Sequence, residues 1–207
     1  MSDHLGELID AACAGRFPAA NGGMTVVARS HPTLETVVAF TGHAVIATAL
    51  SFDVVAAQQP DGFGGAVTPR FLLWLAGERG EVGSHDVLLA AKGLGEPVLP
   101  ARDDLEDHPR VEHARTLRRG VRVFGDDRGL VTRGIGIGGH IEVSVEVAPE
   151  RRNQGIGRQL VRSALGLVAE GQIVVAEVAP GNAQSLRAFL AAGFKPIGSA
   201  VHVRPCR

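Results

Sequence analysis

The order of apolar and polar positions predicts a chain in which strands and helices alternate. Residues 36–40 and 43–48 are rich in β-branched side chains and flank Thr41-Gly42, so they predict a hairpin. Apolar residues at helical spacing predict a helix over residues 3–14. Three further elements are expected before residue 120: a helix from Thr68-Pro69 to Glu78, a strand over 86–91 and a short helix over 111–119.

The pattern is clearer from residue 121 onward. It predicts an antiparallel meander on tight turns, with strands over 121–124, 130–137 and 140–147. A helix with apolar positions from Ile156 to Val168 follows, and then an apolar strand over 173–178. Asn182 can cap a last helix that Gly193 ends, and a final pair of strands is expected over 194–197 and 200–203. The expected fold class is therefore mixed α/β.

Composition and charge exclude several kinds of protein. The chain has 207 residues, of which 45% are hydrophobic and 21% charged, which suits one soluble domain or one domain with an appended half. Its formal net charge of −1 gives no general attraction to nucleic acid or to an anionic membrane. We expect a cytoplasmic protein, because Cys13 and Cys206 form no CxxC pair and no signal-peptide pattern or membrane-spanning run is seen.

The stretch Val145-Glu146-Val147-Ala148-Pro149-Glu150-Arg151-Arg152-Asn153-Gln154-Gly155-Ile156-Gly157-Arg158 carries the clearest chemical signal. A strand ends before Pro149 and a helix begins near Ile156. Glycines allow a ligand close to the backbone, and the N–H groups at a helix N-terminus favour anions. Neighbouring arginines add positive charge. The pattern indicates a pyrophosphate site, although a glycine-rich turn between a strand and a helix is also common in α/β proteins that bind nothing there.

This stretch resembles the acyl-CoA loop of the GNAT N-acetyltransferases, whose signature is Arg/Gln-x-x-Gly-x-Gly/Ala. A second block, Asn182 to Phe194, is similar to the family's Asn-x-x-Ala/Ser-x-x-x-Tyr-x-x-x-Gly-Phe segment. The resemblance covers roughly residues 120–204. It implies a GNAT-type mixed, mostly antiparallel central sheet with helices on both faces. It also implies a V-shaped splay between the two strands at the acyl-CoA site.

The resemblance implies that acetyl-CoA is a co-substrate and assigns residues to it. Backbone groups of Val145 and Val147 should hold the pantetheine arm and the acetyl carbonyl, and Asn182 and Ser185 should touch the cofactor from the other side. The pyrophosphate should lie against Arg152, Gln154, Gly155, Ile156, Gly157 and Arg158. Phe189 stands where the family often has a Tyr as general acid, and the chain contains no Tyr at all. Either another group or water protonates the leaving thiolate, or the chain does not catalyse.

Two carboxylates are candidates for the general base. Glu142, Ser144 and Glu146 alternate along the strand 140–147 and therefore share one face. A carboxylate on a central, covered strand often has a raised pKa, which suits proton abstraction. Family members commonly use a Glu on this strand. Glu142 is the better match and Glu146 the alternative, while a solvated polar face is the competing interpretation.

Three other patterns resemble functional motifs without meeting their requirements. Residues 134–139 satisfy Gly-x-Gly-x-x-Gly, but a strand follows them where a dinucleotide site needs a helix. His108 and His113 are five residues apart, which places them on different faces of a helix, so no metal site is expected. Ser84, His85 and Asp86 are consecutive and cannot form a catalytic triad among themselves.

The sequence thus predicts an acyltransferase that moves an acetyl group from acetyl-CoA to a primary amine of a small molecule or protein by direct attack. The alternative is a non-catalytic acyl-CoA-binding or regulatory module. Residues 1–115 are expected to form the acceptor side and residues 116–207 the acetyl-CoA-binding core. The expected partners are acetyl-CoA and an unidentified amine, with no nucleic acid and no membrane. The protein is expected to be a monomer or a homodimer.

Overall fold

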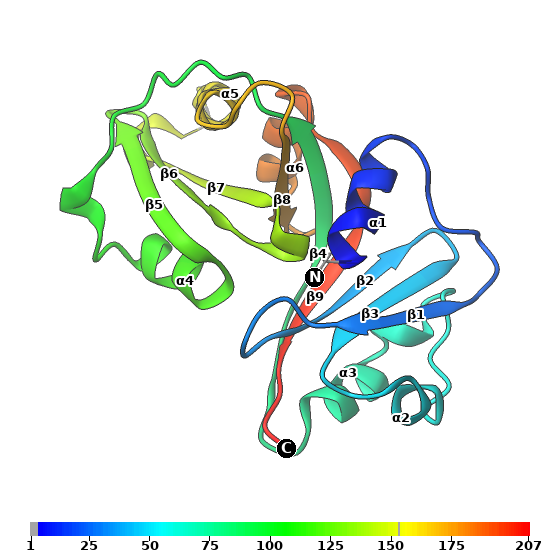
Figure 1. Ribbon diagram of the computed structural model, residues 1–207. Helices are drawn as coiled ribbons and strands as arrows, with labels where there is room; N and C mark the ends of the chain where they lie inside the picture. Colours follow the sequence, from blue (N-terminus) through cyan, green and yellow to red (C-terminus); the bar gives the residue numbers. More distant parts are fainter. Residues whose placement is uncertain (1–3, 153) are drawn as a thin grey trace. The chain divides into compact units, whose positions relative to one another are not determined.

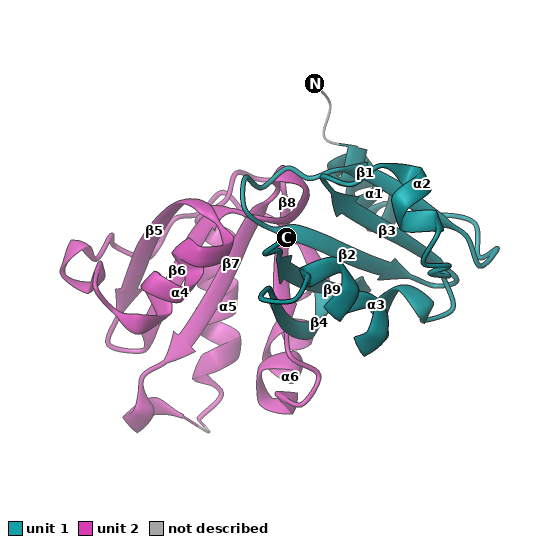
Figure 2. Cartoon of the chain, turned by 90° about the horizontal axis from the view of Figure 1, so that it is seen from below, with its two compact units in different colours: residues 1–88, 197–207 teal, residues 89–196 magenta. Residues whose placement is uncertain are grey.

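The computed structural model describes residues 4–152 and 154–207, and the chain divides into two compact units. The first unit comprises residues up to Leu88 together with Ile197–Arg207, and the second comprises Leu89–Pro196 (Figure 2). Strand β4, Glu81–Lys92, runs from the first unit into the second. None of the helices in the described part of the chain is long and apolar enough to cross a membrane.

The first unit is built on a sheet in the order β1-β3-β2-β9-β4. The β2–β3 hairpin over Thr41-Gly42 is confirmed, β9 is antiparallel to β2, and β1 is parallel to β3. Apolar side chains of α3 pack on this sheet in a core that includes Phe71, Leu75 and Val201. The elements are α1 (His4–Cys13), β1 (Met24–Ala28), β2 (Glu35–Phe40), β3 (His43–Thr48), α2 (Phe52–Ala56), η1 (Gly65–Val67), α3 (Pro69–Ala76) and β9 (Lys195–Arg204).

The expected final pair of strands is wrong: β9 is one continuous strand from Lys195 to Arg204. Gly198 and Ser199 lie between the two expected strands, but Ser199 pairs with Ala39 of β2 within the strand. A Cβ atom at Gly198 would lie 2.6 Å from the carbonyl oxygen of Ala39. This glycine therefore permits a close approach of two backbones and does not turn the chain.

The second unit contains the meander that the sequence predicted. Its strands follow the order β4-β8-β7-β6-β5, with β5, β6 and β7 antiparallel and β8 parallel to β7. The elements are η2 (Asp103–Leu105), α4 (Pro109–Leu117), β5 (Arg119–Asp126), β6 (Gly129–Ile135), η3 (Ile137–Gly139), β7 (Ile141–Val147), η4 (Pro149–Arg151), α5 (Ile156–Gly166), β8 (Ile173–Val178) and α6 (Ala183–Ala191).

Helices cover both faces of the β5–β7 meander (Figure 1). On one face, Val111 of α4 packs on Val123 and Leu130. Leu130 lies opposite Glu146 in the register, so the even-numbered residues of β7 are on this α4 face. On the other face, α5 packs on β6 and β7, and a Cβ atom at Gly157 would lie 3.7 Å from Val147. The mixed, mostly antiparallel sheet with helices on both faces is thereby confirmed.

The parallel pairing of β7 with β8 is given by two residue pairs at the start of β7, Ile141 with Val174 and Glu142 with Val175. A splay beyond Glu142 would be compatible with this register, but the V shape itself stays a prediction. The proposed boundary at residue 115 also stays a prediction about function. The compact units are divided at residues 88 and 196 instead.

Candidate functional site

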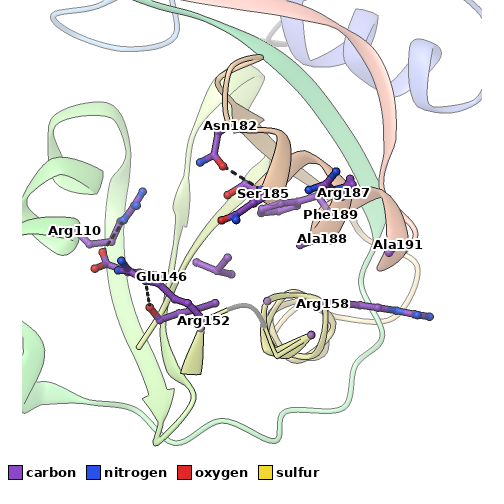
Figure 3. Close-up of a pocket in the computed structure, with 15 residues that line it drawn as sticks. Arg110, Glu146, Arg152, Arg158, Asn182, Ser185, Arg187, Ala188, Phe189 and Ala191 are labelled. Atoms are coloured by element: carbon purple, nitrogen blue, oxygen red, sulfur yellow. Dashed lines mark hydrogen bonds and ion pairs between the residues drawn. The ribbon is translucent and has the colours of Figure 1, made fainter. Parts of the chain in front are cut away.

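A pocket of about 530 Å³ lies in the second unit, where β7 ends and α5 begins. The inner face of α6 forms its other wall, and Arg110 reaches it from α4 (Figure 3). The residues that line it are Arg110, Val145, Glu146, Val147, Arg152, Gly155, Gly157, Arg158, Asn182, Gln184, Ser185, Arg187, Ala188, Phe189 and Ala191. Most of the residues that the sequence assigned to the acyl-CoA site are thus brought together.

The loop before α5 has the backbone that an anion site needs. Gly155 is the N-cap of α5 with a left-handed φ of 76°, and no side chain among the described residues caps the helix there. The first N–H groups of α5 therefore keep their capacity to bind an anion. A Cβ at Gly155 would meet no atom within 4 Å, so the loop is open on that side. Arg152, whose Nε donates to the carbonyl oxygen of Val147 at 3.3 Å, and Arg158 supply positive charge.

The α6 wall combines a capped helix start with an aromatic side chain. The Asn182 side chain accepts a hydrogen bond from the Ser185 amide at 3.1 Å, as the sequence predicted for an N-cap. Phe189 lines the pocket and packs edge-on against Phe194, with ring centroids 5.0 Å apart. At the position where the family often has a Tyr hydroxyl, the pocket therefore presents a carbon surface.

The two candidate bases lie in different environments. Glu146 lines the pocket and is 33% exposed, and its carboxylate accepts from Arg110 Nε at 3.3 Å. Glu142 is 2% exposed and does not line the pocket. Although both are on the α4 face of β7, only Glu146 is placed where a ligand of this pocket could reach it.

Glu142 belongs to a buried polar cluster. Arg118 Nε donates to its carboxylate at 2.5 Å, and a second guanidinium nitrogen also pairs with it. Arg118 further donates to the Thr132 hydroxyl at 3.1 Å, and that hydroxyl is 2.7 Å from the Ser144 hydroxyl. Gly136 leaves room for the carboxylate, since a Cβ there would collide with a Glu142 oxygen. The glycine-rich stretch before β7 thus forms a turn around an ion pair, which agrees with the rejection of a dinucleotide site.

Sequence reasoning missed five lining residues. Four of them, Gln184, Arg187, Ala188 and Ala191, lie on one face of α6 at helical spacing around the expected Ser185 and Phe189, so periodicity could have found them. Arg110 belongs to no motif and had no signal. Gln154 and Ile156 were expected at the pyrophosphate but are not among the lining residues; Gln154 donates to the Glu150 carbonyl. Asn153 of the expected loop lies outside the described residues.

His108, considered and rejected as a metal ligand, has a structural role: its Nδ1 accepts from the Arg110 amide at 3.1 Å and caps α4. Within residues 4–152 and 154–207, no group of three or more His, Cys, Asp or Glu side chains could hold a metal ion.

Residues 126–194 match the sequence model of the Acetyltransferase (GNAT) family. The match contains both the loop before α5 and the α6 block, so the family resemblance drawn from the two motifs is confirmed. A search among curated proteins found no match.

Two solved structures that align with this chain are described in related terms. A "Putative Acetyltransferase from the GNAT family" from Novosphingobium aromaticivorans is 19% identical, with a TM-score of 0.44; the alignment covers 61% of this chain and 66% of that one. A GCN5-related N-acetyltransferase from Kribbella flavida is 15% identical over 100% of this chain and 96% of its own, also with a TM-score of 0.44. This chain spans slightly less than two thirds of the length of the Novosphingobium aromaticivorans protein.

Proposed function

We propose that this protein is an N-acetyltransferase that transfers the acetyl group of acetyl-CoA to a primary amine by direct attack. One observation carries the proposal: the start of α5 at Gly155, the end of β7 and the inner face of α6 line one pocket. The α5 end supplies backbone N–H groups and arginines for phosphates. Val145 and Val147, at the strand end, supply backbone groups that could hold the pantetheine arm.

In the proposed reaction, the neutral amine attacks the thioester carbonyl carbon. A C–N bond forms, the C–S bond breaks, and the CoA thiolate leaves and takes up a proton. The amine nitrogen must lose a proton during this exchange. A backbone N–H of the β7 end is the candidate donor to the developing oxyanion.

Glu146 is the better candidate for the group that takes this proton. It lines the pocket, whereas Glu142 is buried and bonded to Arg118. This ranking is the reverse of the one that the sequence favoured. Removal of a general base typically lowers the rate by about 10²–10⁴-fold. We therefore expect Glu146→Gln to lower kcat by that factor with little change in the affinity for acetyl-CoA.

The second candidate function is a non-catalytic acyl-CoA-binding module, and the placement of Phe189 favours it. Its ring is buried in the pocket wall and has no proton to give to a leaving thiolate. Release of free thiol from acetyl-CoA, measured over a panel of primary amines, separates the two functions. Binding of acetyl-CoA without amine-dependent thiol release would support the module and refute the enzyme.

The cofactor site itself is tested with a matched pair of glycine variants. Gly155 and Gly171 both have φ of 76° and both have open space where a Cβ would be placed. Valine at either position therefore strains the backbone similarly, but only Gly155 adjoins the pocket. We expect Gly155→Val to weaken CoA binding at least about tenfold by calorimetry, the effect of losing a charge-assisted hydrogen bond or more, and Gly171→Val to leave it unchanged. Equal affinities in both variants would show that CoA binds elsewhere.

A further inference from the structure

Arg110 differs from the other arginines of the pocket in where it comes from. It lies in the first turn of α4, on the face of the sheet that carries Glu146, whereas Arg152 and Arg158 adjoin the start of α5 and Arg187 lies on α6. Figure 3 shows Arg110 beside Glu146, with Arg158 on the far side of the α5 start. Arg110 is also outside the segment 126–194 that matches the family. Phosphates held at α5 therefore do not account for Arg110, and its place in the pocket needs another explanation.

The guanidinium of Arg110 is only partly used. Among the described residues, its bond is to Glu146 through Nε, at 3.3 Å. A guanidinium carries five N–H donors in a planar fork, and the edge formed by its two Nη atoms matches a carboxylate. The side chain of Arg110 is 38% exposed, so this edge can be reached by a ligand in the pocket.

The charges of the pocket also favour an anion beyond the phosphates. Its lining includes four arginines and one acid, Glu146. Three of these arginines come from the α5 loop and α6, which form the proposed cofactor side. Arg110 and Glu146 remain as a pair of opposite charges on the other side. Such a pair is complementary to a ligand that carries one anionic and one cationic or amine group close together.

We propose that Arg110 binds the carboxylate of the acceptor, and that the acceptor is a small amine with a carboxylate a few bonds from its nitrogen, as in an α-amino acid. This inference rests on the proposed acetyl transfer. Arg110 can keep Glu146 on its Nε and hold the carboxylate on its Nη edge. The guanidinium then lies between the ligand's carboxylate and Glu146, and the ligand's amine lies beside the Glu146 carboxylate. Glu146 disfavours an anion alone, so a zwitterion or amino acid binds better than a simple carboxylate.

The test compares amines that differ in one negative charge. Two pairs of amines are used: phenylalanine with phenylalaninamide, and lysine with cadaverine. In each pair the second amine lacks the carboxylate. The wild type and the Arg110→Gln variant are each given acetyl-CoA and one amine, and kcat/KM is measured by thiol release. The ratio between the two proteins cancels the intrinsic difference in nucleophilicity of the amines. Loss of a charge-assisted hydrogen bond corresponds to roughly 10–100-fold. Because Arg110 also bonds Glu146, its loss can lower the rate with every amine, so we expect the loss for phenylalanine and lysine to exceed the loss for their carboxylate-free partners by that factor.

Arg115→Gln is the matched control. Arg115 is on the same helix and also pairs with an exposed acid, Glu106, but it does not line the pocket. It should leave both ratios at the wild-type value. Arg110→Lys, which keeps the charge and loses the fork, should fall between the wild type and Arg110→Gln.

Calorimetry separates this inference from the proposed reaction. Phenylalanine is titrated into the CoA-saturated wild type and the CoA-saturated Arg110→Gln variant, and tighter binding to the wild type supports the inference even if no amine releases thiol. Equal binding of phenylalanine to both proteins, or equal kcat/KM ratios, overturns it. A marked loss of CoA affinity in Arg110→Gln also overturns it, because Arg110 would then be a phosphate ligand.

Discussion

The Arg118–Glu142 pair gives a sharp test of how charge is buried in the second unit. Arg118 is 7% exposed and Glu142 is 2% exposed, and the pair is bonded through two guanidinium nitrogens. Arg118→Met removes that partner from a carboxylate that cannot reach bulk water. Removing one member of a buried ion pair costs about 3–5 kcal/mol of unfolding free energy, whereas replacing both with apolar residues is often close to neutral. We expect Arg118→Met to cost that amount and Arg118→Met combined with Glu142→Leu to recover most of it.

The assay is urea unfolding of the wild type, both single variants and the double variant, interpreted as a double-mutant cycle. Glu142→Gln is measured as well, and there the expected effect is mainly lost stability, with kcat nearly unchanged per folded molecule. The reasoning is refuted if Arg118→Met unfolds within about 1 kcal/mol of the wild type, the range of an exposed pair. A folded Glu142→Gln protein that has lost kcat would return the role of base to Glu142.

Three other results are expected. Phe189→Ala should lower the unfolding free energy by about 3–5 kcal/mol because the ring is buried, and a variant of wild-type stability in urea would contradict its packing. Hydrogen bonds from Arg128 hold the pKa of the Asp126 carboxyl below its ordinary value. The pair therefore stabilises the fold at pH values above the pKa of the unfolded state. This stabilisation is lost as the pH falls through the lower pKa of the folded state. Asp126→Asn should therefore cost at most about 1 kcal/mol at pH 7 and nothing in acid, as urea unfolding at both pH values will show. Burial raises the pKa of the Cys13 thiol to about 11, so iodoacetamide at neutral pH should label exposed Cys206 first; mass spectrometry showing the reverse order would contradict this.

Much of the second unit could be predicted because its local signals agree with one another. The strand over 173–178 and the Asn182 cap appear as expected, since an apolar run between turns and a capping side chain are both local features. The break expected in β9 was wrong because Gly198 is required by a contact between strands: the carbonyl of Ala39 lies too close for a side chain. The short strand β1, Met24–Ala28, was not anticipated, and its pairing with β3 is likewise a non-local contact.

The site was predictable to the extent that motifs define it. Gly155, Asn182 and Phe189 were assigned through the resemblance to the family's two motifs, and they line one pocket. Arg110 was not, because an arginine in the first turn of a helix carries no sequence signal of what lies opposite it. The choice between two acids on one strand face also depended on tertiary contacts. Periodicity places Glu142 and Glu146 on the same side of the strand. Only the folded arrangement shows that Glu142 is bonded to Arg118.

The contact between Gly136 and Glu142 restricts which residues the chain can have at these two positions. A side chain at position 136 would collide with the carboxylate at 142, so position 136 cannot take a larger residue while Glu142 keeps its place. Among relatives of this protein, a residue larger than glycine at 136 should accompany a shorter or apolar residue at 142, with the arginine at 118 lost as well. The three positions thus form a sequence signature of the buried charge. Related chains could be grouped by the residues at positions 118, 136 and 142. In chains that keep all three, the glycine-rich stretch is expected to form a turn around the ion pair and no nucleotide-binding loop.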